Sequence, residues 1–225
     1  MNAGVVLAAG ASRRMGRVKP LVKARGSSFL LTGVRNLWSA CECVVVVLGA
    51  HAPAVRAAVE KEIGLLARND ALRRPSTRGR RASARGLEAR FQVNGHWREG
   101  MLSSARAGLR AALAMDPELV LLLPVDHPAV RPATVQALAA AMSAALGAFG
   151  GKRARSSFAY ALVPRYRRRR GHPIALSPAL ARAVAGDSGA TDLSDSVRRN
   201  TRLIGYLDCA DRGILVNRNL PSRRA

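Results

Sequence analysis

A short apolar run near the start of the chain ends in a loop that combines small residues with cations. In LAAGASRRMGRVK, residues 7–19, two alanines and a glycine follow the run, and Arg14 and Lys19 come after them. Residues with almost no side chain let a phosphate approach the backbone, where N–H groups attract anions. Arginine and lysine neutralise phosphate oxygens. The spacing matches neither the dinucleotide fingerprint nor the standard P-loop, but it predicts a loop that binds a nucleoside triphosphate.

A single carboxylate follows a second apolar run. In LLLPVDHP, residues 121–128, Asp126 comes just after a predicted buried strand. Ligands of parallel sheets bind beyond the carboxyl ends of the strands, so we expect this carboxylate to face the cationic loop. An aspartate in that position is suited to hold Mg²⁺ beside a phosphate.

Hydrophobic patterning predicts the elements that would position these residues. Strands are expected at 3–7, 43–48, 91–93, 119–123, 158–163, 203–207 and 214–216, and helices at 29–39, 55–66, 101–115, 132–146 and 178–184. Strands and helices alternate, which indicates an α/β fold with a mostly parallel central sheet. We expect a single domain over residues 1–225, interrupted by an arginine-rich, exposed loop or insertion at about 68–90.

The formal net charge of +23 would attract nucleic acid, an anionic membrane or a phosphorylated ligand. Most of the basic residues are arginine, so a general bias in composition also explains the charge. The segment 68–90 is rich in arginine but has no hydrophobic period and no aromatic residue on which a base could stack. Nucleic-acid binding is therefore not expected from it. No apolar stretch reaches twenty residues, and no membrane span is expected. Three cysteines without a disulfide pattern favour a reducing compartment, the cytoplasm.

The loop motif resembles a known signature. Leu-Ala-Ala-Gly-x-Ser-x-Arg-Met-Gly-x-x-Lys is similar to the signature of nucleotidyltransferases with a three-layer, Rossmann-like fold of the glycosyltransferase-A type, and within these to the molybdenum cofactor cytidylyltransferase group. Later segments are similar to the same group: VNGHWREGMLSSARAGL at 93–109, LLLPVDHP at 121–128, RRGHPIALSPAL at 169–180 and GDSGATDL at 186–193.

The resemblance implies a reaction and a set of site residues. CMP would pass from CTP to molybdopterin with release of pyrophosphate, in a Mg²⁺-dependent step that involves Lys19, Arg14 and Asp126. The nucleotide would contact Leu7, Ala8, Ala9, Gly10, Arg14, Lys19, Asn94, Ser103 and Ser104. The acceptor would lie against Gly171, His172 and Pro173, and the metal would be held by Asp126 and Asn219. The product would serve an enzyme of the xanthine dehydrogenase type or its cofactor chaperone.

Two departures from the family pattern keep alternatives open. Asn217 and Asn219 stand where the family has aspartates, and a neutral amide holds a hard cation less strongly than a carboxylate. One alternative is a transferase of the same fold that acts on another phosphorylated acceptor, such as a sugar phosphate or a phospholactate. The other is a non-catalytic protein that binds nucleic acid through its positive charge.

Overall fold

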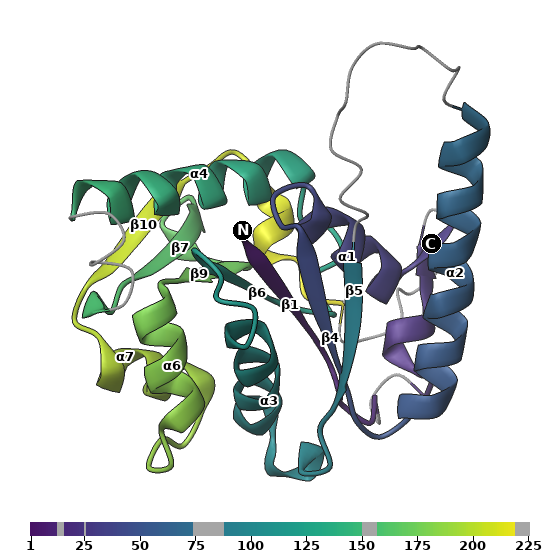
Figure 1. The fold of residues 1–225 in the computed structure, drawn as a ribbon, viewed down its shortest axis with the longest axis horizontal. Helices are drawn as coiled ribbons and strands as arrows, with labels where there is room; N and C mark the ends of the chain where they lie inside the picture. Colours follow the sequence, from purple (N-terminus) through teal and green to yellow (C-terminus); the bar gives the residue numbers. More distant parts are fainter. Residues whose placement is uncertain (13–15, 25, 74–87, 150–156, 219–225) are drawn as a thin grey trace.

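The chain folds around one central sheet that lies between two layers of helices (Figure 1). The computed structural model describes residues 1–12, 16–24, 26–73, 88–149 and 157–218. The sheet contains β1 (Ala3–Ala8), β4 (Cys43–Leu48), β5 (Glu88–Val93), β6 (Val120–Pro124), β7 (Ala161–Tyr166), β8 (Arg169–Arg170), β9 (Ile174–Leu176) and β10 (Ile204–Asp208). A separate two-stranded ladder joins β2 (Lys23–Ala24) to β3 (Ser27–Ser28).

The sheet is parallel in one half and mixed in the other. Its strand order is β10-β7-β9-β6-β1-β4-β5, with β8 paired to β7. Strands β6, β1, β4 and β5 run parallel, whereas β9 runs antiparallel to β6 and β7. Strands β1 and β4 are apolar at every position because both faces of the sheet are covered. The predicted α/β fold with a mostly parallel sheet is confirmed.

Helices cover both faces of the sheet. They are α1 (Phe29–Trp38), α2 (Ala52–Arg73), α3 (Met101–Leu113), α4 (Pro132–Ala148), α6 (Pro178–Gly186) and α7 (Leu193–Asn200), with short 3₁₀ helices η2 (Lys19–Leu21), η3 (Trp97–Glu99) and η4 (Arg212–Leu215). Alternate side chains of β1 divide between two cores. Val6 packs with α1, α2 and α4, and Val5 packs with α3, α6 and α7. In the described parts of the chain, no helix is both long and apolar enough to cross a membrane.

Some predicted boundaries are wrong. Helix α2 continues to Arg73, and β5 begins at Glu88 because it pairs with the whole length of β4. The exposed loop predicted at 68–90 is therefore wrong at residues 68–73 and 88–90, and residues 74–87 lie outside the described residues. The strand predicted at 214–216 is also wrong, since η4 occupies most of that segment.

Short elements in and beside the mixed half of the sheet were not predicted from the sequence. Strands β8 and β9 have two and three residues, too few to show a period of two. Helix α7 is mostly polar, and it begins where the side chain of Asp192 accepts a hydrogen bond from the backbone N–H of Asp195. In the chain, β8 comes just before the Gly-His-Pro segment at residues 171–173, and β9 and α7 come after it.

A buried aspartate fixes η4 against α4. Asp211 is 4% exposed, and its carboxylate accepts hydrogen bonds from the backbone N–H of Arg131 at 2.9 Å, the hydroxyl of Thr134 at 2.7 Å and the backbone N–H of Gly213 at 2.8 Å. The chain after η4 then reaches Arg218, whose N–H donates to the backbone oxygen of Asp126 at 2.8 Å. Asp211 therefore positions a segment that lies directly beside the predicted site.

Replacing Asp211 with alanine should lower the free energy of unfolding by about 2–4 kcal/mol, because three donors would lose their buried acceptor. Urea denaturation monitored by circular dichroism measures this change. Glu60→Ala is a matched control, since it removes a carboxylate from an exposed i,i+4 pair with Arg56 and should cost no more than about 0.5 kcal/mol. Equal effects of the two substitutions would contradict the role of Asp211.

Candidate active site

A cleft of about 380 Å³ opens at the carboxyl ends of β1 and β6. Neighbouring parallel strands bring these ends together: Leu7 is paired with Pro124, and the N–H of Val125 donates to the oxygen of Leu7 at 3.0 Å. The cleft is lined by Leu7, Ala8, Ala9, Gly10, Ser12, Lys19, Pro20, Trp97, Gly100, Met101, Ser104, Pro124, Val125, Asp126 and Asn217. The cationic loop and the aspartate predicted from the sequence therefore share one cavity.

The loop after β1 closes through a serine. The hydroxyl oxygen of Ser12 accepts a hydrogen bond from the backbone N–H of Lys19 at 2.9 Å, and Ser12 has a positive φ of 56°. Lys19 then begins η2, in which Pro20 is buried. This closure fixes the direction in which the lysine leaves the loop. Arg14, which we predicted to bind phosphate, lies outside the described residues.

Lys19 and Asp126 face each other across the cleft. The Nζ of Lys19 is 3.8 Å from Oδ2 of Asp126, and the two side chains are only 16% and 14% exposed. The pair is therefore largely shielded from water. Opposite charges interact more strongly in such shielded surroundings than at an open surface. A cation and a carboxylate are thus held within reach of one ligand.

The second oxygen of Asp126 lacks a protein partner. Oδ1 is buried and has no hydrogen-bond donor, while Nε2 of His127 is 3.8 Å away. A buried carboxylate oxygen without a donor suits a bound cation. No cluster of three or more His, Cys, Asp or Glu side chains placed to hold a metal occurs among the described residues. A metal here would take one carboxylate from the protein and its remaining oxygens from Asn217, water and phosphate.

Helix α3 points its amino end into the cleft. The residue before the helix is Gly100, whose φ of 102° is a conformation that favours glycine. Gly100, Met101 and Ser104 line the cavity. The first N–H groups of a helix attract anions and polar ligand atoms. One wall of the site thus combines helical N–H groups with the apolar surfaces of Met101 and Trp97.

Asn94 forms hydrogen bonds with the first turn of α3. It is 5% exposed, and its amide nitrogen donates to the hydroxyls of Ser103 at 3.0 Å and Ser104 at 3.1 Å. Its amide oxygen accepts from the N–H of His96 at 3.0 Å. The amide is thus engaged within the protein, as is the hydroxyl of Ser103, which also donates to backbone oxygens of His96 and Gly100.

Two histidines border the aspartate, the buried His127 and the partly buried His172. The rings of His127 and His172 have centroids 4.7 Å apart, and Nδ1 of each ring is buried without a hydrogen-bond partner. Burial, together with the neighbouring His127, lowers the pKa of His172 to about 4. Burial also lowers the pKa of His127, against the opposing effect of Asp126. Both rings are consequently neutral at pH 7.

The Gly-His-Pro segment reaches the site because it interrupts a strand. Strands β8 and β9 both pair with β7, and residues 171–173 leave the sheet between them. A side chain on Gly171 would approach the backbone oxygen of Ile214 to 2.5 Å, so glycine is needed for η4 to pack here. The N–H of His172 donates to the same oxygen at 3.1 Å.

The structure brings most of the predicted residues together. Lys19, Asp126, Ser104 and the loop from Leu7 to Gly10 line the cleft, and His172 contacts the adjoining His127. Asn219 lies outside the described residues. Other cleft residues were not among the predicted site residues, including Ser12, Trp97, Met101 and Asn217. Trp97 and Met101 were within reach of prediction, since both lie in the segment 93–109 that resembles the family.

A comparison with protein families gives a direct result. The model of the MobA-like NTP transferase domain matches residues 4–203. The chain belongs to the MobA-like NTP transferase family. It is an enzyme of the nucleotidyltransferase type, and the predicted resemblance is confirmed at this level. The match includes the loop after β1, Asp126 and the Gly-His-Pro segment, and ends before η4.

Individual relatives carry different names. The MobA-like chain is 34% identical over 215 residues to nicotine blue oxidoreductase of Paenarthrobacter nicotinovorans, covering 92% of this chain and 87% of the relative. Among solved structures, it resembles the manganese complex of Rv0371c from Mycobacterium tuberculosis, with a TM-score of 0.57, 22% identity, and 92% and 88% of the two chains covered. It also resembles molybdopterin-guanine dinucleotide biosynthesis protein A of Archaeoglobus fulgidus, with a TM-score of 0.54, 17% identity, and 92% and 83% covered.

The neutral His172 should make the stability of this MobA-like domain depend on pH. Its folded-state pKa of about 4 lies below its ordinary value of 6.5, so the unfolded chain binds a proton that the folded chain excludes. The resulting stability is fully present above about pH 6.5 and is lost as the pH falls toward 4. We expect His172→Gln to flatten the decrease in melting temperature over this window, measured by calorimetry.

The exposed His51 provides the control for this titration. His51→Gln removes an exposed side chain outside the cleft and should leave the pH dependence of the melting temperature unchanged. If His172→Gln retained the full wild-type slope, the buried ring would not be the group responsible.

Proposed function

We propose that this MobA-like domain transfers CMP from CTP to the terminal phosphate of molybdopterin and releases pyrophosphate. A Mg²⁺ ion would accompany the triphosphate, and the reaction would take place in the cytoplasm. The product, a molybdopterin cytosine dinucleotide, would serve an enzyme of the xanthine dehydrogenase type. The sequence motifs shared with cytidylyltransferases of this kind support the choice of base and acceptor.

One observation carries the proposal: Lys19 and Asp126 lie 3.8 Å apart in a single cleft, next to a loop of small residues. Nucleotidyl transfer needs little covalent chemistry from the protein and depends on positioning and charge stabilisation. A site with a shielded cation and a shielded carboxylate suits that requirement.

Each described residue has a role in the proposed reaction. The loop from Leu7 to Gly10 binds the nucleotide through its backbone, and Lys19 neutralises the phosphates that become pyrophosphate. An oxygen of the acceptor phosphate attacks the α-phosphorus in line, and the bond to the pyrophosphate oxygen breaks. The acceptor phosphate is already anionic, so the neutral His172 orients the acceptor and removes no proton. Arg14 would add a second phosphate contact.

The donor set fits a divalent cation. When bound, Mg²⁺ would neutralise phosphate oxygens and orient the α-phosphate. Asp126 would hold it through the buried Oδ1, and Asn217 would offer a neutral oxygen from the edge of the cleft; Asn219 is the second amide that we propose for this role. The manganese complex of Rv0371c, which has the same fold, also supports divalent metal use.

Replacing Lys19 with alanine should lower the rate of pyrophosphate release from CTP and molybdopterin by about 10²–10³, because the charge on the leaving group would lose its stabilisation. A coupled pyrophosphate assay measures the rate. Lys23→Ala is the matched control, since Lys23 is an exposed residue of β2, and its rate should remain within about twofold of wild type.

The same assay tests the base and the acceptor. Each of the four nucleoside triphosphates is supplied with molybdopterin, and then CTP is supplied with a sugar phosphate or a phospholactate. Turnover with another base or another acceptor, and none with CTP and molybdopterin, would replace the proposed substrates. An unchanged rate in the Lys19→Ala variant would instead remove the proposed role of the lysine.

A second candidate follows from the 34% identical relative that is named nicotine blue oxidoreductase. A nicotinamide dinucleotide contains a pyrophosphate that would suit the same loop, and the apolar wall of Trp97 and Met101 would suit a planar dye. The single described carboxylate in the cleft also suits a reaction with less need for metal. Two electrons and a proton would pass from the dihydronicotinamide to the dye.

This candidate is tested by following the absorbance of nicotine blue and of NADH or NADPH with the purified protein. Stoichiometric loss of both signals, in the absence of pyrophosphate release from any triphosphate, would favour the oxidoreductase. Pyrophosphate release without any change in the dye would favour the transferase. Met101→Ala should weaken dye turnover without affecting the Lys19–Asp126 pair.

A further inference from the structure

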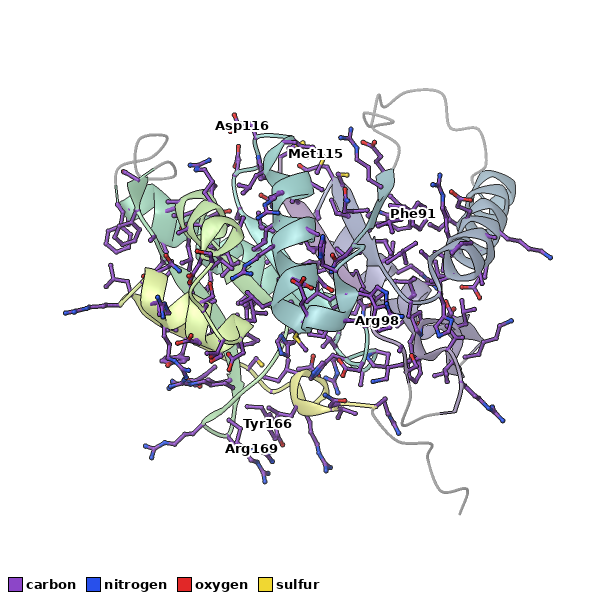
Figure 2. The ribbon with its side chains drawn as sticks, turned by 90° about the horizontal axis from the view of Figure 1, so that it is seen from below. Phe91, Arg98, Met115, Asp116, Tyr166 and Arg169 are labelled. Carbon is purple, nitrogen blue, oxygen red and sulfur yellow. The ribbon has the colours of Figure 1, made fainter. Side chains whose placement is uncertain are left out.

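A hairpin of arginines stands at the edge of the mixed half of the sheet. We call residues 165–170 the basic hairpin: β7 ends at Tyr166, two residues turn, and β8 returns so that Tyr166 is paired with Arg169. The side chains from 167 to 170 are exposed. Figure 2 shows Tyr166 and Arg169 extending from the molecule near η4. The segment 171–173 follows directly, so the hairpin lies on the acceptor side of the cleft but outside it.

The turn of this hairpin has an unfavourable sequence for its backbone. Arg167 and Arg168 have φ values of 47° and 62°. A two-residue loop with both φ values positive is a type I′ turn, in which Asn-Gly is favoured because other side chains are strained there. The other described non-glycine residues with positive φ are Ser12 and Asp116, both small and polar.

A bias toward arginine in the composition does not account for this choice. Such a bias adds arginine readily at exposed positions that any residue can occupy. At Arg167 and Arg168 the backbone itself disfavours the side chain, so the two cations are kept at the tip against a local cost in stability. Local strain of this kind is found where a residue type is needed for function.

Two further arginines of the hairpin, Arg165 and Arg170, are oriented by contacts with neighbouring side chains. Arg165 forms two hydrogen bonds with the carboxylate of Asp208, at 3.0 and 2.7 Å. The guanidinium carbons of Arg165 and Arg170 lie 4.6 and 5.0 Å from the ring centre of Tyr206. Packing on an aromatic ring reduces the entropy that each side chain would lose on binding an anion. The hairpin thus presents a preorganised set of cations.

The aromatic rings indicate which anion fits. Proteins that bind single-stranded nucleic acid stack bases on exposed aromatic faces. Here Arg165 and Arg170 lie over Tyr206, and the guanidinium carbon of Arg167 lies 5.4 Å from the ring centre of Tyr166. The two rings therefore already lie against guanidinium groups. The N–H edges of the exposed guanidinium groups from 167 to 170 are suited to carboxylates, which guanidinium binds in a two-point geometry.

We propose that the basic hairpin binds a glutamate- and aspartate-rich segment of a partner protein. The bound segment would lie beside the acceptor side of the cleft, because the hairpin packs against η4 and continues into the Gly-His-Pro segment. This surface lies outside the cleft, so the interaction holds or fails independently of the reaction catalysed.

The test compares two pairs of arginines that carry the same charge. Arg167→Gln with Arg168→Gln removes the tip cations, and Arg35→Gln with Arg202→Gln removes two exposed arginines elsewhere. Arg35 lies in α1, and Arg202 precedes β10 at the end opposite to Asp208. The probes are a labelled oligoglutamate peptide and a labelled oligothymidine of equal length. Fluorescence anisotropy at about 0.15 M salt, where distant surface charges are screened, measures both affinities.

The hairpin variant should bind oligoglutamate about tenfold more weakly than wild type, and the control variant should stay within about twofold. A third variant, Arg167→Asn with Arg168→Gly, should bind the peptide as weakly as the glutamine variant. Its melting temperature should nevertheless rise above that of wild type, because Asn-Gly relieves the turn. Lower affinity together with higher stability would separate a binding role from a structural one.

Three results would overturn the proposal. Equal losses in the hairpin and control variants would mean that net charge alone attracts the peptide. A larger hairpin-dependent loss for oligothymidine than for oligoglutamate would identify nucleic acid as the ligand. Full peptide affinity in the Asn-Gly variant would show that the tip arginines are not required.

Discussion

The site depends on an electrostatic contact between two side chains from distant parts of the chain. Lys19 and Asp126 are brought together because β1 and β6 are neighbouring parallel strands whose carboxyl ends are in register. Strands buried on both faces can be neither shifted by one residue nor twisted apart without disturbing two cores at once. The apolar sheet therefore places a cation and a carboxylate next to each other in the cleft, where both side chains are largely shielded from solvent.

The parallel half of the fold could be predicted because its signals are local and strong. The runs in β1, β4 and β6 are apolar at every position, and the residues that follow them carry the chemistry. Ligands bind beyond the carboxyl ends of parallel strands. This rule predicts that Lys19 and Asp126 lie in one site, whatever the sequence between them.

The mixed half could not be predicted in the same way. Ile214 and Val216 are β-branched and favour a strand, but the buried Asp211 caps a 3₁₀ turn there and the fold overrides the preference. Strand β9 is recognisable only through its partners, and Trp97 reaches the cleft through a single short turn, η3. The amide of Asn94 donates hydrogen bonds to Ser103 and Ser104 inside the protein. The sequence motif alone does not distinguish this structural role from contact with a ligand.

The two halves of the sheet position their loops in different ways. The loop after β1 follows a strand that is buried at every position, whereas residues 171–173 leave the sheet between the short strands β8 and β9. Substitutions at neighbouring positions of β1 would therefore disturb both cores at once, whereas the border of the cleft at residues 171–173 is fixed locally by its packing against Ile214. Proteins similar to this chain in sequence or in fold carry names as different as nicotine blue oxidoreductase and molybdopterin-guanine dinucleotide biosynthesis protein A.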